Sequence, residues 1–221
     1  QVAQIDQLGR LKRFFSPQLA EVILAGGEDM LKTHRREISV VFIDLRGFTA
    51  FTDQAEPEEV MEMLNAFHAA MGRIVVAHGG TLERFAGDSL MVFFNDPVPM
   101  ERPAEAAVRM AMEMQQAFVA LGLEWQKRGF ELGLGCGVAQ GYATLGQIGF
   151  EGRRDYAAIG SVTNLAARLC AEARAGQVLV DRKTMARIET LVRAAPLGAL
   201  TLKGFTQPVP AFVVEALQVA A

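Results

Sequence analysis

Two aspartates, each in a short turn bordered by apolar runs, constrain the fold of this chain more than any other feature. Asp44 ends the run 38–43, whose β-branched and aromatic residues predict a strand buried on both faces. Asp88 lies between the apolar runs 81–85 and 90–94, which predict a β-hairpin with this aspartate at its tip. A carboxylate at the end of a buried strand is costly unless something binds it there.

Either aspartate alone would fit an ordinary turn, where this residue type is common. Two carboxylates that converge would instead form an oxygen-rich site for Mg²⁺ or Mn²⁺, which usually also takes substrate phosphate oxygens. The first strand is followed by a turn into a helix over residues 45–49. The free backbone N–H groups of Gly47, Phe48 and Thr49 would therefore suit phosphate binding.

A third segment adds a polar pair to these two turns. Asn164 and Arg168 are four residues apart, on one face of a helix that we expect to begin near Ser161 or Val162. Spacing alone would fit a solvated helix edge beside an apolar stripe. The order of the three segments along the chain is more specific than any one of them.

In that order the chain resembles the class III nucleotidyl cyclase catalytic domain, the family of adenylyl and guanylyl cyclases. The resemblance runs from about residue 37 to about residue 215 and rests on four segments: 42–49, Gly87-Asp88, 159–169 and Leu202-Lys203-Gly204. It implies an α+β fold, a ferredoxin-like βαββαβ sheet with additional C-terminal strands. It also implies that two domains pair head to tail, with the active sites at the interface of the homodimer.

The order of apolar and turn segments agrees with such a fold. From residue 37 onward it predicts a strand, a helix, two strands, a helix, two strands, a helix and closing strands. We expect the helices on one face of the sheet, and a second hairpin formed by 132–138 and 142–148 around residues 139–141. This order brings the end of the first strand beside the Asp88 hairpin.

We divide the chain into a helical extension, residues 1–36, and a catalytic domain, residues 37–221. Ser16-Pro17 predicts a helix start, and Gly26-Gly27 its end. Apolar residues at helical spacing precede it: Ile5, Leu8, Leu11, Phe14 and Phe15. The extension ends in a basic cluster that we interpret as a solvated linker: Lys32, His34, Arg35 and Arg36. We expect the extension to transmit a signal from an upstream sensor domain.

The resemblance assigns a metal role to the first two segments. Asp44 and Asp88 match the family's metal ligands, and the backbone carbonyl of Leu45 would help to hold the second of two Mg²⁺ or Mn²⁺ ions. In a nucleotidyl cyclase the ribose 3′-oxygen attacks the α-phosphorus and expels pyrophosphate, and two ions divide the work of activating the hydroxyl and neutralising the triphosphate.

It also assigns the polar groups that hold the nucleotide. Asn164 matches the residue that orients the ribose. Arg168 matches the residue that stabilises charge at the α-phosphate, where a planar guanidinium suits phosphate oxygens. Lys203 matches a lysine for the terminal phosphates, although an exposed lysine at a strand end is an equally ordinary reading.

The two base-binding positions depart from the family pattern. Adenylyl cyclases usually keep a lysine four residues before the second metal aspartate, and an aspartate or threonine seven before the asparagine. Here these positions are Arg84 and Ala157, which also differ from the guanylyl pattern. Arginine donates but cannot accept a hydrogen bond, and alanine does neither. Tyr142 stands where some members keep a phosphate-binding arginine. We expect weak discrimination between ATP and GTP, with ATP favoured because adenylyl cyclases are frequent in the family.

Composition excludes several other classes. The net charge of −3 without a basic stripe argues against nucleic-acid binding. No run of eighteen apolar residues occurs, so we expect no membrane span. Cys136 and Cys170 have no metal-like spacing and indicate buried thiols in a reducing compartment. Because the chain begins with Gln1, we expect a cytoplasmic part of a longer protein, which a membrane anchor elsewhere would still allow.

The sequence therefore leaves three functions from different classes open. The first is an active homodimeric cyclase that makes cyclic AMP, or a cyclase with GTP or relaxed base preference. The second is a cyclase-like regulatory module that binds nucleotide without turnover. The third is another phosphotransfer enzyme on a ferredoxin-like sheet, such as a diguanylate cyclase or a polymerase palm. Those families carry a Gly-Gly-Asp/Glu-Glu/Asp-Phe hairpin, whereas residues 86–89 here read Ala-Gly-Asp-Ser.

Overall fold

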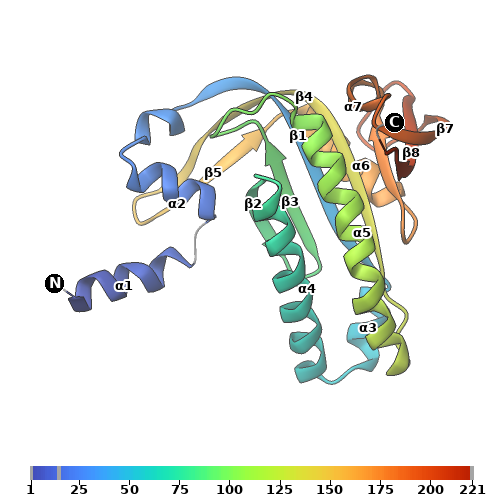
Figure 1. Ribbon diagram of the computed structural model, residues 1–221, viewed down its shortest axis with the longest axis horizontal. Coiled ribbons are helices and arrows are strands. Elements are labelled where there is room, and N and C mark those ends of the chain that lie inside the picture. The colour runs from blue at the N-terminus through green and yellow to red at the C-terminus, as the bar shows by residue number, and fades with distance from the viewer. Residues whose placement is uncertain (1, 14–15, 220–221) are drawn as a thin grey trace.

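The structure is a computed structural model that describes residues 2–13 and 16–219. Eight strands form one sheet in the order β2-β3-β1-β4-β6-β8-β7, with β5 paired to β4 (Figure 1). The strands are β1 (His34–Arg46), β2 (Thr81–Ala86), β3 (Ser89–Phe94), β4 (Gly133–Phe150), β5 (Arg153–Ile159), β6 (Val178–Asp181), β7 (Val192–Leu200) and β8 (Val209–Leu217). The helices are α1 (Val2–Lys12), α2 (Pro17–Leu24), η1 (Glu28–Leu31), α3 (Phe48–Gln54), α4 (Pro57–Ala77), α5 (Pro103–Lys127), α6 (Ser161–Glu172) and α7 (Arg182–Ile188).

The first four strands confirm the predicted ferredoxin-like core. In the order β2-β3-β1-β4, β1 is antiparallel to both β3 and β4. Asp44 lies opposite Ser89 in the β1–β3 register, beside the turn that carries Asp88. The predicted hairpin is therefore present, with Gly87 and Asp88 between β2 and β3.

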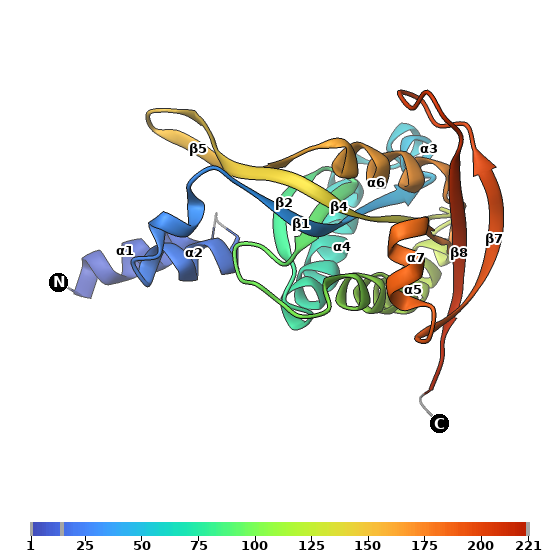
Figure 2. The same cartoon turned by 90° about the horizontal axis from the view of Figure 1, so that it is seen from above.

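Strand β1 is buried on both faces, as its apolar run predicts. Val41 and Ile43 belong to the cluster beneath α4 and α5, whereas Ile38 and Val40 face the cluster that includes residues of α6. The prediction of helices on one face is correct for α4 and α5 but wrong for α6, which covers the opposite face (Figure 2). Because β1 buries alternate residues in both directions, each face needs its own cover.

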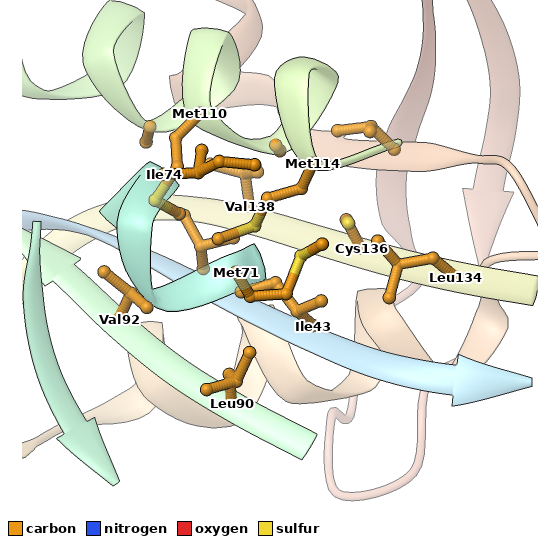
Figure 3. Packing of buried hydrophobic residues seen from close by; sticks show 14 of the residues in the cluster. Ile43, Met71, Ile74, Leu90, Val92, Met110, Met114, Leu134, Cys136 and Val138 are labelled. Carbon is orange, nitrogen blue, oxygen red and sulfur yellow. The ribbon is translucent and has the colours of Figure 1, made fainter. Parts of the chain in front are cut away.

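The larger cluster lies between the sheet and the two long helices. Met71 and Ile74 of α4 and Met110 and Met114 of α5 pack over strand residues that include Ile43 (Figure 3). Helical periodicity placed both helices correctly, since their apolar stripes face the sheet. Burial of this apolar surface stabilises the packing of the helices on the sheet, and the sheet in turn positions the strand ends near Asp44 and Asp88.

Strand β4 corrects the predicted second hairpin. Residues 139–141 are not a turn, because the 18-residue strand β4 continues through them and pairs with β1 over residues 133–145. The hairpin instead joins β4 to β5 through residues 151–152. The buried side chain of Gln140 binds the Ser39 hydroxyl and donates to Glu37 Oε1 at 3.1 Å, so a polar residue is accommodated mid-strand.

The N-terminal extension forms the predicted helix after Ser16, with Pro17 in its first turn and Gly26 in the left-handed region after its end. Phe14 and Phe15 lie outside the described residues. The interpretation of the basic cluster as a solvated linker is wrong for residues 34–36, which form the start of β1 and pair with residues 143–145. Their partners are far away in sequence, so no local pattern reveals them.

Among the described residues, no helix combines the length and apolar composition that crossing a bilayer requires.

Candidate active site

The two predicted metal-binding aspartates meet at one edge of the sheet. The N–H group of Leu45 donates to the backbone oxygen of Asp88 at 3.0 Å, which fixes the end of β1 against the hairpin turn. Burial, followed by the hydrogen bond and charge of the neighbouring Asp88 carboxyl, raises the pKa of Asp44 to about 6. The structure thus brings two carboxylates together at a cost in free energy.

One oxygen of this pair has no partner within the described residues. Asp44 Oδ1 is buried without a hydrogen bond, and Oδ2 has an arginine nitrogen, Arg46 Nη1, at 3.6 Å. An orphaned carboxylate oxygen beside a second carboxylate fits a hard divalent cation. Within the described part of the chain, no group of three or more histidine, cysteine or acidic side chains could hold a metal. Asp44, Asp88 and the Leu45 carbonyl would therefore need further oxygen ligands, which substrate phosphates and water can supply.

Arg46 links this edge of the sheet to α6. No role was predicted for it from the sequence. Its Nε donates to Ala173 O at 2.9 Å and its Nη2 donates to Cys170 O, so the guanidinium binds carbonyls at the end of that helix. The side chain crosses Gly135, where a Cβ atom would lie 2.3 Å from Nη2. Gly135 lies opposite Asp44 in the β1–β4 register, a pairing that only the structure reveals.

The predicted phosphate loop is a tight turn between β1 and α3. Gly47 has φ of 83° in the left-handed region, and a Cβ there would lie 2.4 Å from the backbone oxygen of Glu131. The first bond of the helix runs from the Phe51 N–H to Gly47 O at 3.1 Å. The first N–H groups of a helix have no partner inside it, so those at Phe48 and Thr49 remain suited to an anion.

Asn164 and Arg168 lie on the exposed side of α6, the helix predicted to carry them. The opposite side rests directly on β4, since a Cβ at Gly137 would lie 2.4 Å from Ala166 O and 2.3 Å from Cys170 N. Neither Asn164 nor Arg168 makes a side-chain hydrogen bond or an ion pair within residues 2–13 and 16–219. Two groups of high hydrogen-bonding capacity are therefore presented outward.

The remaining predicted residues are spread over three elements. Lys203 is exposed in the turn between β7 and β8, beside Gly204 with φ of 88° and the buried Leu202. Arg84 is exposed on β2, whereas Ala157 is buried on β5. No contact joins Lys203 to the carboxylates in the hydrogen bonds or ion pairs of the described residues.

Tyr142 lies on β4, and Glu83 lies on β2 next to Arg84. The ring of Tyr142 lies 4.9 Å from the guanidinium carbon of Arg35. Glu83 was not predicted. Its Oε2 accepts a hydrogen bond from the Ala158 N–H at 3.1 Å, next to Ala157. An irregular strand register places it there, which a residue count from Asp88 cannot reveal.

Fold and site together define an α+β domain in which a ferredoxin-like sheet carries two converging carboxylates beside a backbone loop suited to phosphate. The chain belongs to the adenylate and guanylate cyclase catalytic domain family, whose sequence model matches residues 30–216. Members of this family act on nucleotides with divalent metal ions and form dimers of cyclase domains.

Known relatives include both kinds of cyclase. The structure of the adenylyl cyclase CyaB from P. aeruginosa superposes with a TM-score of 0.81 at 35% identity, covering 84% of this chain and 97% of that one. The structure of the guanylyl cyclase Cya2 has a TM-score of 0.80 at 30% identity, covering 85% and 95%. Adenylate cyclase 1 of Rhizobium meliloti is 32% identical over 173 residues, 77% of this chain and 26% of that protein. The chain spans about a quarter to two fifths of the length of the curated relatives it matches.

Proposed function

We propose that this chain is the catalytic domain of an adenylyl cyclase, which converts ATP to 3′,5′-cyclic AMP and pyrophosphate between two copies of itself. One observation carries the proposal. The two carboxylates converge with an orphaned oxygen, while Asn164 and Arg168 point outward from α6 without partners among the described residues. Each chain thus carries two half-sites: the carboxylate edge and the Asn164–Arg168 face of α6. A second copy is the simplest source of the complementary half for each of them.

Asp44, Asp88 and the Leu45 carbonyl would hold two ions, Mg²⁺ or Mn²⁺. Bound ions of this kind lower the pKa of the ribose 3′-hydroxyl and neutralise the triphosphate. The chain's own contribution at this edge is to hold the carboxylates in place, through the Leu45–Asp88 backbone bond and the packed core beneath it. The N–H groups of Gly47, Phe48 and Thr49 would bind phosphate oxygens beside them.

The partner copy would supply the groups that orient the nucleotide and stabilise its transition state. Asn164 would hydrogen-bond the ribose, so that the 3′-oxygen lies in line with the α-phosphorus. Arg168 would donate to the α-phosphate oxygens as the new 3′-O–P bond forms and the bond to pyrophosphate breaks. Lys203 would pair with the terminal phosphates, and the hydroxyl proton would leave to water.

Mixing inactive variants tests the shared site. Asp44→Ala and Arg168→Ala proteins should each be inactive, because every site of either homodimer lacks one essential group. Mixed together, they should regain activity, since a heterodimer contains one site with both groups intact. A mixture of Asp44→Ala with Asp88→Ala is the matched control and should stay inactive, because every site lacks a carboxylate. Full activity of a monomer would refute the arrangement.

GTP is the competing substrate, and the similarity to Cya2 favours it. Incubation with each nucleoside triphosphate and either Mg²⁺ or Mn²⁺, with products identified by mass, separates adenylyl from guanylyl activity. It also separates both from a module that binds nucleotide without turnover. Cyclic AMP as the main product supports our proposal, whereas cyclic GMP alone or no cyclic product contradicts it.

We propose that residues 1–36 transmit a signal from an upstream domain. The support is a direct contact: Gln18 of α2 donates to Gly79 O at 2.6 Å and binds the Thr81 hydroxyl at the start of β2. Movement of α2 would act on the strand that precedes Asp88. Gln18→Ala, which breaks both bonds, should change cyclase activity or dimer affinity. Glu21→Ala, on the exposed side of the same helix, should change neither.

A further inference from the structure

Strand β2 contains one more residue than its pairing with β3 requires. Leu82 lies opposite Val92 and Arg84 lies opposite Met91, so Glu83 is the extra residue of a β-bulge. Met91 belongs to the cluster on the α6 side of the sheet, which also contains residues of β5. Arg84 therefore shares the Met91 face of the sheet, and Glu83 beside it reaches Ala158 of β5 instead of alternating to the opposite face.

The carboxyl group of Glu83 is held against the free edge of β5. Its Oε2 accepts the Ala158 N–H at 3.1 Å, while β5 pairs with β4 along its other edge. The other carboxylate oxygen makes no hydrogen bond within the described residues. Burial raises the pKa of Glu83, and the Ala158 N–H and the Arg84 charge act in the opposite direction. A fixed, partly buried acceptor thus lies beside Ala157 and next to a donor, Arg84.

This arrangement supplies what the two expected base positions lack. Arg84 can only donate, and Ala157 has no polar side-chain atom. The Watson–Crick edge of adenine carries an amine donor at C6 next to the ring acceptor N1. An acceptor and a donor on neighbouring residues of one strand match that edge.

We propose that Glu83 accepts a hydrogen bond from the 6-amino group of adenine while Arg84 donates to the ring, so that the β2 bulge selects the base. The inference rests on the proposed function, because it places the base of ATP beside β2 and β5. It replaces the expectation of weak discrimination, which considered Arg84 and Ala157 alone.

The test compares ATP with purine riboside triphosphate, which lacks the amine. Wild-type protein should use ATP with a kcat/KM on the order of tenfold to a hundredfold higher, the effect of one buried hydrogen bond. Glu83→Gln keeps an oxygen for the Ala158 N–H but turns an amide donor toward the base. The ATP advantage should then fall to about threefold or less. Glu151→Gln is the matched control, since it makes the same change at an exposed residue of the β4–β5 turn that has no hydrogen bond within the described residues, and its ratio should equal that of the wild type.

Binding of both nucleotides is measured beside turnover, with unfolding curves to confirm that each variant is folded. An unchanged ATP advantage in Glu83→Gln would overturn the role of Glu83 while leaving the cyclase proposal intact. Absence of any cyclic product from wild-type protein would refute the cyclase proposal, and the binding ratios would still decide the role of Glu83. A loss confined to GTP relative to ITP would show that the carboxylate reads guanine, and would also overturn the inference.

Discussion

Asp44 lies near the end of β1 and Asp96 follows the neighbouring strand β3, yet the two carboxylates have opposite electrostatic environments. The side chain of Asp96 is fully buried, accepts the Tyr156 hydroxyl, and lies 2.5 Å from His34 Nε2 and 3.6 Å from Arg36 Nε. Asp44 is 38% exposed, lies beside a second carboxylate, and keeps one buried oxygen without a partner among the described residues.

The difference separates a structural carboxylate from one that awaits a ligand. A buried charge is tolerated when hydrogen bonds and opposite charge replace the lost water, as they do around Asp96. Around Asp44 the environment raises the pKa of the carboxyl group instead, because the nearby donors do not fully replace the water that the charged form has lost. A site that keeps such a cost in the free chain is a candidate for function.

Replacing Asp44 by asparagine should abolish cyclase activity, with a loss of at least about a thousandfold, because the group proposed to hold both ions is removed. The same change should raise the free energy of unfolding without metal by roughly 1 kcal/mol, after discounting for solvent screening, since the carboxylates no longer repel. Thermal unfolding with and without Mg²⁺ measures both effects, because the variant should also lose stabilisation by the ion. Activity within a few-fold of wild type would contradict the assignment.

Replacing Asp96 by alanine should lower the free energy of unfolding by about 3–5 kcal/mol, because Tyr156 and Arg36 lose a buried partner. Urea unfolding followed by circular dichroism measures this change. Asp6→Ala serves as control, since it removes a carboxylate paired with Arg10 on the exposed α1 and should cost less than about 1 kcal/mol. Equal effects of the two substitutions would mean that Asp96 is not a structural charge.

Stability should also depend on pH through His34. Burial lowers the pKa of His34, but the hydrogen bonds to Asp96 and to the Lys32 carbonyl, together with the Asp96 charge, outweigh it, and the net shift is upward. The stabilisation is therefore fully present below the unfolded pKa, about 6.5, and is lost as pH rises through the higher folded value. Between pH 6 and 8 the wild type should lose stability more steeply than His34→Gln, by less than about 1 kcal/mol because the ring is partly exposed. Parallel pH profiles of the two proteins would exclude this contribution.

Features of the fold that depend on local sequence could be predicted, whereas those that depend on long-range contacts could not. The β1 run, the Asp88 hairpin and the two long helices follow from local periodicity and turn residues, and the structure confirms each of them. The Asp96 network joins residues about 60 positions apart, so no local pattern reveals that His34 and Arg36 belong to a strand. The turn predicted at residues 139–141 was wrong because long-range pairing with β1 overrides the local preference of glycine and glutamine.

The residues of the candidate site likewise include some that the sequence predicted and others that it did not. Asp44 and Asp88 were expected to converge because strand order alone brings them together, and they do. The metal, ribose and phosphate roles of the site residues remain predictions. Arg46 and Glu83 could not be selected in advance, since one depends on helix carbonyls more than a hundred residues away and the other on a bulge.

Arg46 gives the molecule a mechanical property. Because its guanidinium lies beside Asp44 and also binds the last turn of α6, we expect the carboxylate edge and the helix that carries Asn164 and Arg168 to move as one body. In the proposed pair, each such body contributes opposite halves to two different sites. One angle between the two bodies would then set the width of both sites at once. A regulatory domain that changes this single angle would open or close the two sites in step, without touching a residue in either of them.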